Sequence, residues 1–275
     1  MTTPPILVIG ATGKVGRRVV ANLAAMDKPV RPAGRNTPLT FDWQDRSNWL
    51  EHFTDVETAY VSYYPDLASP QGADDIAALS AIAKKAGLKR MVLLSGRGET
   101  GAEKAEQALM DSGLGYTILR SAWFNQNFSE GHLQPAIMSG MIAMPAGQRR
   151  EPFIDVDDIA EVATAALTDD SHDNQLYVLT GPDLLTFADA ATAINAAAGL
   201  NVAYLPVSLQ DFHAGLTAEL GPEVADLLTS VCEETFDGRN ESVADGVMRA
   251  LGRPPRDFAE FCRKAAVSGA WKKAA

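Results

Sequence analysis

Short apolar runs alternate with longer stretches of mixed polarity along the first 120 residues of the chain. Seven apolar runs are expected to be strands: 6–9, 30–33, 39–41, 58–61, 90–94, 116–119 and, further on, 176–179. The stretches between the early runs predict helices at 13–25, 45–53, 74–86 and 103–111. Pro32 removes a backbone donor from the second run, which weakens it as a strand. This alternation is typical of a parallel sheet with helices on both faces.

The pattern changes after Arg120. A loop-rich stretch covers residues 121–150, and a helix begins within 155–158 and continues to about residue 167. Beyond residue 181 the chain is expected to be mainly helical, at 187–198, 209–220, 223–235 and 258–266. Neither an internal repeat nor a low-complexity linker separates the two halves.

These elements predict an α/β fold: a Rossmann-type doubly wound parallel sheet with a smaller, mainly helical C-terminal part. Residues 1–155 are expected to form the sheet domain, completed near 176–179. Residues 156–275 are expected to form mainly a lid that binds the substrate over the carboxyl ends of the strands.

A glycine motif, Gly10-Ala-Thr-Gly-Lys-Val-Gly16, follows the first predicted strand and opens the first helix. Gly10 permits a tight turn, Gly13 lets the backbone approach a diphosphate, and Gly16 lets the helix pack closely on the sheet. The free N–H groups of the helix start favour an anion there. Thr12, Lys14 and Val15 share the loop and join it as candidate cofactor-binding residues. The alternative is a turn without a ligand, but a plain turn does not need three glycines.

The end of the second strand indicates which dinucleotide binds. Sites for NAD usually place an acid there, whereas this sequence reads Pro32-Ala-Gly-Arg35-Asn36. An arginine suits the 2′-phosphate of NADP, and Lys14 would add a second positive charge. Either cation could instead be a solvated surface residue. The expected cofactor is NADPH (NADP), so residues 1–155 become the NADP(H)-binding domain.

With these motifs in place, the chain resembles the NmrA-like group of atypical short-chain dehydrogenases/reductases. The resemblance covers most of the chain. It rests on these segments: GATGKVG at 10–16, Phe41-Asp42-Trp43, VLLSG at 92–96, KAEQAL at 104–109, SGLGYTILR at 112–120, Trp123-Phe124-Asn125, FIDVDDIA at 153–160 and YVLTG at 177–181. The chain is also similar to the reductases of ergot-alkaloid assembly and to the NADPH-dependent quinone reductases of the group. The resemblance implies an NAD(P)H-dependent oxidoreductase.

The resemblance also implies roles for single residues. Asp42 and Trp43 would lie near the adenine, and the loop with Tyr63 and Tyr64 beside the cofactor. Trp123 and Phe124 would lie near the nicotinamide. Ser95, with Gly96 beside it, would lie on the nicotinamide side, and Lys104 would bind the ribose. For Tyr63, Tyr64, Trp123 and Phe124 the alternative is ordinary core packing.

The sequence departs from typical short-chain dehydrogenases at the proton donor. Ser95 and Lys104 stand where the pattern puts Ser and Lys, but the tyrosine position holds Thr100. A tyrosine can be tuned into a usable acid, and an aliphatic hydroxyl cannot. The proton would then come from Tyr63, Tyr64 or water, with Lys104 on the ribose. Alternatively, the substrate is one that needs little acid catalysis, such as an iminium, a quinone or a conjugated enone.

A third interpretation is a non-catalytic NADP(H)-binding redox sensor or regulator of NmrA type. The substantial predicted lid favours an enzyme that reduces a small organic molecule. Trp123, Phe124, Asn125, His132 and Phe212 are the candidate substrate contacts. His132 could be an exposed loop residue, and Phe212 could belong to the apolar core face of its helix.

Composition further limits which partners and which cellular location are expected. The chain has 275 residues, 46% of them hydrophobic, and a formal net charge of −11, which disfavours a nucleic-acid partner. It shows neither a signal peptide nor a membrane span, so we expect a cytoplasmic protein with a small-molecule substrate, as a monomer or homodimer. Cys232 and Cys262 lack the spacing of a disulfide framework or zinc site. The acids at 155, 157 and 158 suit a helix start better than a metal site.

Overall fold

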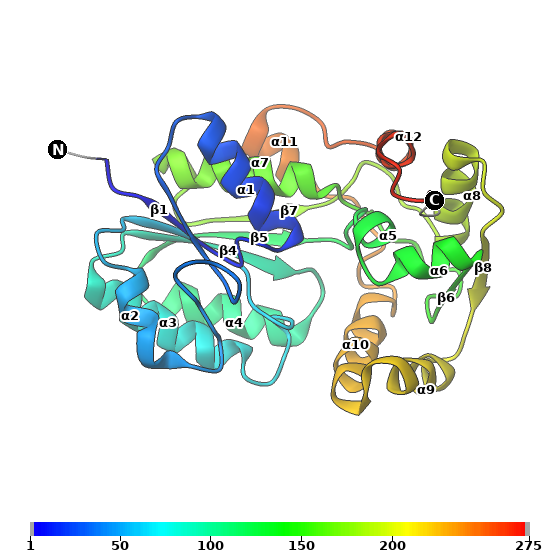
Figure 1. The fold of residues 1–275 in the computed structure, drawn as a ribbon, viewed down its shortest axis with the longest axis horizontal. Helices are drawn as coiled ribbons and strands as arrows, with labels where there is room; N and C mark the ends of the chain where they lie inside the picture. The colour runs from blue at the N-terminus through cyan, green and yellow to red at the C-terminus, as the bar shows by residue number, and fades with distance from the viewer. Residues whose placement is uncertain (1–2, 273–275) are drawn as a thin grey trace.

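The main sheet of the computed structural model, which describes residues 3–272, has six parallel strands (Figure 1). The strands are β1 (Ile6–Ile9), β2 (Val30–Ala33), β3 (Thr58–Val61), β4 (Arg90–Gly96), β5 (Gly115–Ser121) and β7 (Gln175–Leu179). Their order across the sheet is β2-β1-β3-β4-β5-β7. The order reverses beside β1, so the loops after β1 and β3 diverge and open a crevice at the carboxyl edge.

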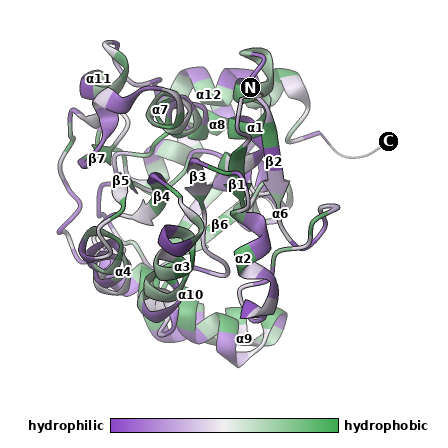
Figure 2. Ribbon diagram, turned by 90° about the vertical axis from the view of Figure 1, so that its left-hand side faces the viewer, coloured by the Kyte–Doolittle hydropathy of each residue, from purple (hydrophilic) through white to green (hydrophobic). Residues whose placement is uncertain are grey.

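Helices cover both faces of this sheet (Figures 1 and 2). One layer holds α1 (Lys14–Ala25), α7 (Val156–Thr168) and α11 (Gly246–Leu251), with the short 3₁₀ turn Asp170–His172 after α7. The other holds α2 (Trp49–His52), α3 (Gly72–Ala86) and α4 (Thr100–Asp111), with the 3₁₀ turn Arg46–Asn48 before α2. Each layer packs against its own apolar face of the sheet. This arrangement confirms the predicted fold class.

A second group of elements lies beside the carboxyl ends of the strands (Figure 1). Its members are α5 (Asn127–Glu130), α6 (Leu133–Ser139), β6 (Met141–Met144), α8 (Phe187–Ala198), β8 (Ala203–Pro206), α9 (Leu209–Leu220), α10 (Pro222–Thr235) and α12 (Phe258–Ser268). Strands β6 and β8 pair in parallel, apart from the main sheet. A third core forms here around Phe128, Phe153, Phe187 and Phe258, whose rings contact one another.

The chain crosses between these groups more than once. Strand β7 pairs with β5, with Leu119 opposite Tyr177, so the apolar run at 176–179 does extend the main sheet. Helix α7 packs on α1, and α11 packs on α7 and β7. The division into a domain at 1–155 and a lid at 156–275 therefore stays an approximate prediction, because three elements after residue 155 support the sheet.

Two predicted elements in the first half are wrong. Residues 39–41 form no strand, and an isolated bridge between Gly34 and Thr40 is all that remains of pairing there. The run is apolar because Phe41, 2% exposed, packs in an aromatic cluster with Trp43 and Trp49. The helix expected at 45–53 is a 3₁₀ turn followed by four residues of α2.

The loop-rich interpretation of residues 121–150 is also incomplete. This stretch contains α5, α6 and β6, and β8 and α11 were not predicted further along the chain. All five are short, at four to seven residues each. Short elements carry too few turns or alternations for a periodic signal, and packing rather than local propensity decides them.

Buried charges tie the C-terminal segment to the sheet layer. The Asp158 carboxylate on α7 is fully buried. It pairs with Arg253, at 2.7 Å from Nη2, and with Arg256, whose backbone N–H also donates to it at 2.8 Å. Glu161, one turn further along α7, pairs with the same two arginines. The segment that leads into α12 is therefore fixed on α7.

Removing the buried carboxylate should be costly, since two guanidinium groups would lose their buried partner and keep only the partly exposed Glu161. We predict that Asp158→Ala lowers the free energy of unfolding by about 3–5 kcal/mol. Asp170→Ala is the matched control: its side chain is 97% exposed and pairs with Arg90 at 3.1 Å. Its loss should cost less than about 1 kcal/mol, because the carboxylate is exposed to solvent and Arg90 keeps Asp173 and the Asp169 carbonyl as partners. Urea unfolding of both variants measures the difference, and equal losses would contradict the anchoring role of Asp158.

Candidate functional site

The glycine loop after β1 has no room for side chains. Gly10 has a φ of +80°, its N–H donates to Ala33 at 3.0 Å, and its carbonyl accepts from the Gly13 N–H at 2.9 Å. A Cβ on Gly16 would lie 2.1 Å from the Gly10 carbonyl oxygen. Helix α1 starts directly after Gly13, and no side chain caps it. Its first N–H groups therefore remain available to an anion, and the loop fits a dinucleotide diphosphate.

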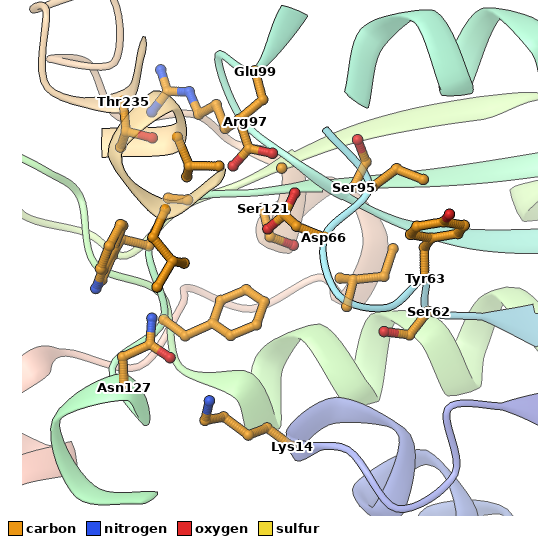
Figure 3. Close-up of a pocket in the computed structure, with 18 of the residues that line it drawn as sticks. Lys14, Ser62, Tyr63, Asp66, Ser95, Arg97, Glu99, Ser121, Asn127 and Thr235 are labelled. Atoms are coloured by element: carbon orange, nitrogen blue, oxygen red, sulfur yellow. The ribbon is translucent and has the colours of Figure 1, made fainter. Parts of the chain in front are cut away.

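The remaining residues of the loop take different positions. Thr12 and Gly13 are exposed, whereas Val15 is buried in the core beneath the loop. Lys14, the first residue of α1, is half-buried and directed toward the cavity described below (Figure 3). Burial and the charges of Arg17 and Arg18 lower the pKa of Lys14.

Arg35 lies exposed just beyond β2. Its guanidinium carbon is 4.0 Å from the ring centre of Tyr64, which is itself 55% exposed. Within residues 3–272, no carboxylate forms an ion pair with Arg35. The aromatic face orients the cation while leaving its N–H groups free, an arrangement that suits an anionic phosphate.

The Tyr63 side chain is held by its neighbours. Its hydroxyl donates to Asp75 at 2.7 Å, and its ring contacts Trp43 with centroids 4.4 Å apart. Burial and the bond to Asp75 raise the pKa of Tyr63 to about 12. Tyr63 lines the cavity and Tyr64 does not, and their role as proton source stays a prediction. Asp42 caps the turn at Gln44, and whether Asp42 and Trp43 meet an adenine stays a prediction.

A cavity of about 300 Å³ lies at the carboxyl ends of the strands (Figure 3). The loops after β3, β4 and β5 form one side of it, and α10 contributes Leu228, Val231 and Thr235 from the other. Of the predicted site residues, the cavity brings together Lys14, Tyr63, Ser95, Gly96, Trp123, Phe124 and His132. The first strand's glycine loop and the predicted nicotinamide side thus open into one space.

Three predicted site residues lie elsewhere. Lys104 is exposed on the outer face of α4, because the inner face carries Ala102, Ala105, Glu106 and Leu109. Asn125 is fully buried and does not reach the cavity. Phe212, on α9, packs against the third core instead of lining the cavity. The structure places all three outside the cavity, and the ribose role of Lys104 and the substrate roles of Asn125 and Phe212 stay predictions.

The Ser–Lys pair of the typical pattern is absent for the same reason. Ser95 Oγ donates to Glu106 Oε1 at 2.6 Å, and the fully buried Glu106 also pairs with Arg120. Thr100, at the tyrosine position, donates to Glu234 of α10 at 2.8 Å. Ser95 is thus held toward a carboxylate rather than toward Lys104.

His132 lies in the cavity wall, where its ring contacts Trp123. The residue is nevertheless exposed to solvent, as the alternative interpretation expected, and partial desolvation together with the nearby charge of Lys14 lowers the pKa of His132. The imidazole is therefore neutral near pH 7, and it can exchange hydrogen bonds with a ligand without acting as a cationic acid.

Sequence reasoning missed three carboxyl groups in the same cavity: Asp66, Glu99 and Glu151. Burial raises the pKa of each, and mutual repulsion raises that of Glu99 further. They come from three separate loops, so no motif spacing joins them. The sequence does give a weak indication that two of them lie near the site, since Asp66 follows Tyr63-Tyr64-Pro65 and Glu99 immediately precedes Thr100.

Glu151 is the most enclosed of the three, at 1% exposed. Its Oε1 accepts from the Trp123 N–H at 3.2 Å, and its Oε2 has no partner within the described residues. Burial raises the pKa of Glu151 to about 7, although Trp123 and Arg97 favour its charged form.

Other expected features can be placed as well. Asp155 caps α7 by accepting from the Asp157 N–H at 2.9 Å, as predicted. Cys232 and Cys262 are buried free thiols. Across residues 3–272 no three His, Cys, Asp or Glu side chains gather as metal ligands would. The helices in that range are also too short or too polar to cross a bilayer.

Two relatives align with nearly the whole chain. YesF of Bacillus subtilis strain 168, an uncharacterized oxidoreductase, is 32% identical over 278 residues, which cover 95% of each chain. The NAD(P)H azoreductase of Xenophilus azovorans is 31% identical over 283 residues, covering 94% of this chain and 96% of the relative. The chain belongs to the NmrA-like group of atypical short-chain dehydrogenases/reductases. This NmrA-like protein is accordingly an NAD(P)H-dependent oxidoreductase.

The NmrA-like fold agrees with a solved structure. The NADPH-dependent quinone oxidoreductase of Escherichia coli, complexed with NADPH, superposes with a TM-score of 0.79 at 24% identity. The match covers 94% of this chain and 99% of that one. No protein-family profile matches the chain.

The buried Glu151 gives this NmrA-like protein a pH-dependent stability. An acid with a raised pKa in the folded state binds its proton more tightly there. Stability is therefore lost as the pH rises from 4.5, the ordinary value, through the folded value of about 7. We predict that Glu151→Gln becomes more stable relative to the unmutated protein by up to about 3 kcal/mol between about pH 5 and pH 8.

Urea unfolding at several pH values measures this gain. Glu219→Gln, at an exposed position of α9, is the control and should run parallel to the unmutated protein. A constant difference between Glu151→Gln and the unmutated protein would show that the pKa of Glu151 is ordinary.

Proposed function

We propose that this NmrA-like protein is an NADPH-dependent reductase that transfers hydride to a small organic substrate: a quinone, imine or iminium, enone or ketone. One observation carries the proposal. Lys14 begins α1 directly behind the glycine loop, and it lines the same cavity as Ser95, Gly96 and Trp123. A dinucleotide held by the loop would therefore extend into the space where a substrate fits.

The residues fit NADPH in three places. Gly10, Gly13 and Gly16 keep the loop and the start of α1 close together, since a Cβ on any of them would crowd Ser62 or the Gly10 carbonyl, and the uncapped start of α1 favours the diphosphate. Arg35, oriented over Tyr64, is the candidate for the 2′-phosphate. When bound, the cofactor supplies hydride to the substrate.

The cavity walls supply positioning and exclude water. Trp123 and Phe124 line it together with Leu228 and Val231 of α10, so a substrate would meet apolar surfaces on both sides. The neutral His132 offers a hydrogen bond at the Lys14 end. The azoreductase and quinone oxidoreductase relatives support a flat, conjugated acceptor of this size.

Arg35 should determine the cofactor preference. We predict that Arg35→Ala weakens NADPH binding by about tenfold or more, since a hydrogen bond to a charged group contributes about 1.5–3 kcal/mol. NADH, which lacks the 2′-phosphate, should lose less than about twofold. Titration calorimetry with both cofactors measures this.

Lys104→Ala is the control, because Lys104 is an exposed cation outside the cavity. Its NADPH affinity should match that of the unmutated protein. A tenfold loss in Lys104→Ala would support its ribose role, and equal NADPH and NADH affinities in the unmutated protein would contradict the assignment of Arg35.

The proposed activity is tested by NADPH oxidation, followed by absorbance, against quinones, cyclic imines, enones, simple ketones and an azo dye. We expect saturable turnover with at least one class. Tight NADPH binding with no turnover on any class would contradict the reductase and favour an NADP(H)-binding redox sensor.

A further inference from the structure

Glu99 occupies an unusual place for a carboxyl group. It is the N-cap residue of α4, yet its side chain makes no capping hydrogen bond. The carboxyl group folds back over β4 instead: a Cβ on Gly96 would lie 2.1 Å from Glu99 Oε2. Figure 3 shows it pointing into the cavity, where Asp66 enters the same space. Glu99 is 9% exposed, and it directly precedes Thr100, which holds the tyrosine position of typical short-chain dehydrogenases.

The surroundings of Glu99 are acidic on every side. Four carboxyl groups act on it: Asp66 from the loop after β3, Glu106 of α4, Glu151 from the loop before α7, and Glu234 of α10. The Cys232 thiol also faces it from α10, and burial together with the Glu99 charge raises the pKa of that thiol to about 12. Arg97, on the same loop, donates instead to the carbonyls of Asn240 and Ser242.

Burial and this repulsion raise the pKa of Glu99 well above its usual range. No guanidinium or ammonium group pairs with its carboxyl within residues 3–272. The raised pKa favours the protonated carboxylic acid, which would place a transferable proton beside the cavity.

Each of the other acidic groups near the cavity accepts at least one hydrogen bond, although Glu151 Oε2 has no partner within the described residues. Glu106 accepts from Ser95 and Arg120. Asp66 accepts from the Ala68 N–H at 2.8 Å, Glu151 accepts from Trp123, and the Tyr63 hydroxyl donates to Asp75. Among the described residues, Glu99 combines a cavity position with a carboxyl group that makes no hydrogen bond.

We propose that Glu99 is a catalytic residue of the proposed reductase: its carboxylic acid protonates the substrate in place of the missing tyrosine. The proposal rests on the reductase function above. It assigns the proton donor for neutral acceptors, such as imines and ketones, whose heteroatom must gain a proton on reduction.

The step balances as follows for a C=N or C=O acceptor. Hydride from the reduced cofactor forms a C–H bond, and the π electron pair moves onto the heteroatom. The heteroatom takes the Glu99 proton, the O–H electron pair stays on the carboxylate, and the cofactor is oxidised by two electrons. Water then returns a proton to Glu99, and the surrounding carboxylates favour that return.

Two substrates distinguish the effect of proton transfer from that of hydride transfer. A neutral cyclic imine needs both, whereas its N-alkylated iminium cation needs hydride alone. We expect Glu99→Gln, of nearly equal shape, to lose about 10²–10⁴-fold in kcat/KM on the imine and to stay within about threefold on the iminium. Glu99→Asp, which keeps a carboxyl group, should retain part of the imine activity. Glu233→Gln, at an exposed position of α10, should match the unmutated protein on both.

A second readout needs no cofactor. Infrared difference spectra at neutral pH between the unmutated protein and Glu99→Gln should show the carbonyl band of a protonated carboxylic acid, shifted in D₂O. The spectrum against Glu233→Gln should lack it. This band reports the protonation of Glu99 whether or not a substrate is turned over.

The outcomes are distinct. Selective loss on the imine, with the band present, supports Glu99 as the proton donor. Equal loss on both substrates, no loss on either, or absence of the band would each overturn it. If the unmutated protein reduces neither substrate but turns over another acceptor class, this proposal alone is overturned; failure on every acceptor class overturns the reductase function with it. The band still reports whether Glu99 is protonated.

Discussion

The contact between Gly16 and the Gly10 carbonyl is the constraint from which the site follows. With a Cβ 2.1 Å from that oxygen, nothing larger than hydrogen fits, and α1 lies directly against β1. The close approach aims the first turn of α1 at the carboxyl edge of the sheet, beside the reversal of strand order. Lys14 then enters the cavity because it is the first residue of that turn. A larger distance between α1 and β1 at Gly16 would move the start of α1, where an anion is expected to bind, away from the cavity.

The cavity has one cation that lies apart from its acids. Lys14 comes from α1, whereas Asp66, Glu99 and Glu151, together with Arg97, come from loops around the other end. Burial lowers the pKa of Lys14 and raises the pKa of Glu99 and Glu151, so it disfavours the charged form of each group. Such a site admits neutral aromatic or conjugated molecules more readily than a row of ionised carboxylates would.

Much of the fold was predictable because it rests on local patterns. The strand bounds at 6–9, 30–33 and 58–61 were predicted to the residue, and so was the anion-binding turn. Lys104 and the acids could not be placed by the same means. Whether residue 104 or 106 faces the sheet depends on the rotation of α4, which buried packing sets, and the cavity acids meet only through tertiary structure. The strand predicted at 39–41 was wrong for a related reason. An apolar run indicates burial, but it does not show whether the residues pack in a sheet or, like Phe41, in an aromatic cluster.

Helix α9 has no buried residue, and α10 is buried mainly at Ala225 and in its last turns. The two helices contact each other extensively, and they meet the third core through Cys232 of α10 and through Leu209 and Phe212 of α9. The wall that α10 presents to the cavity is thus loosely coupled to overall stability. Side chains such as Leu228 can change in size at little thermodynamic cost, and the molecule can alter which acceptor it takes while its nucleotide half remains untouched.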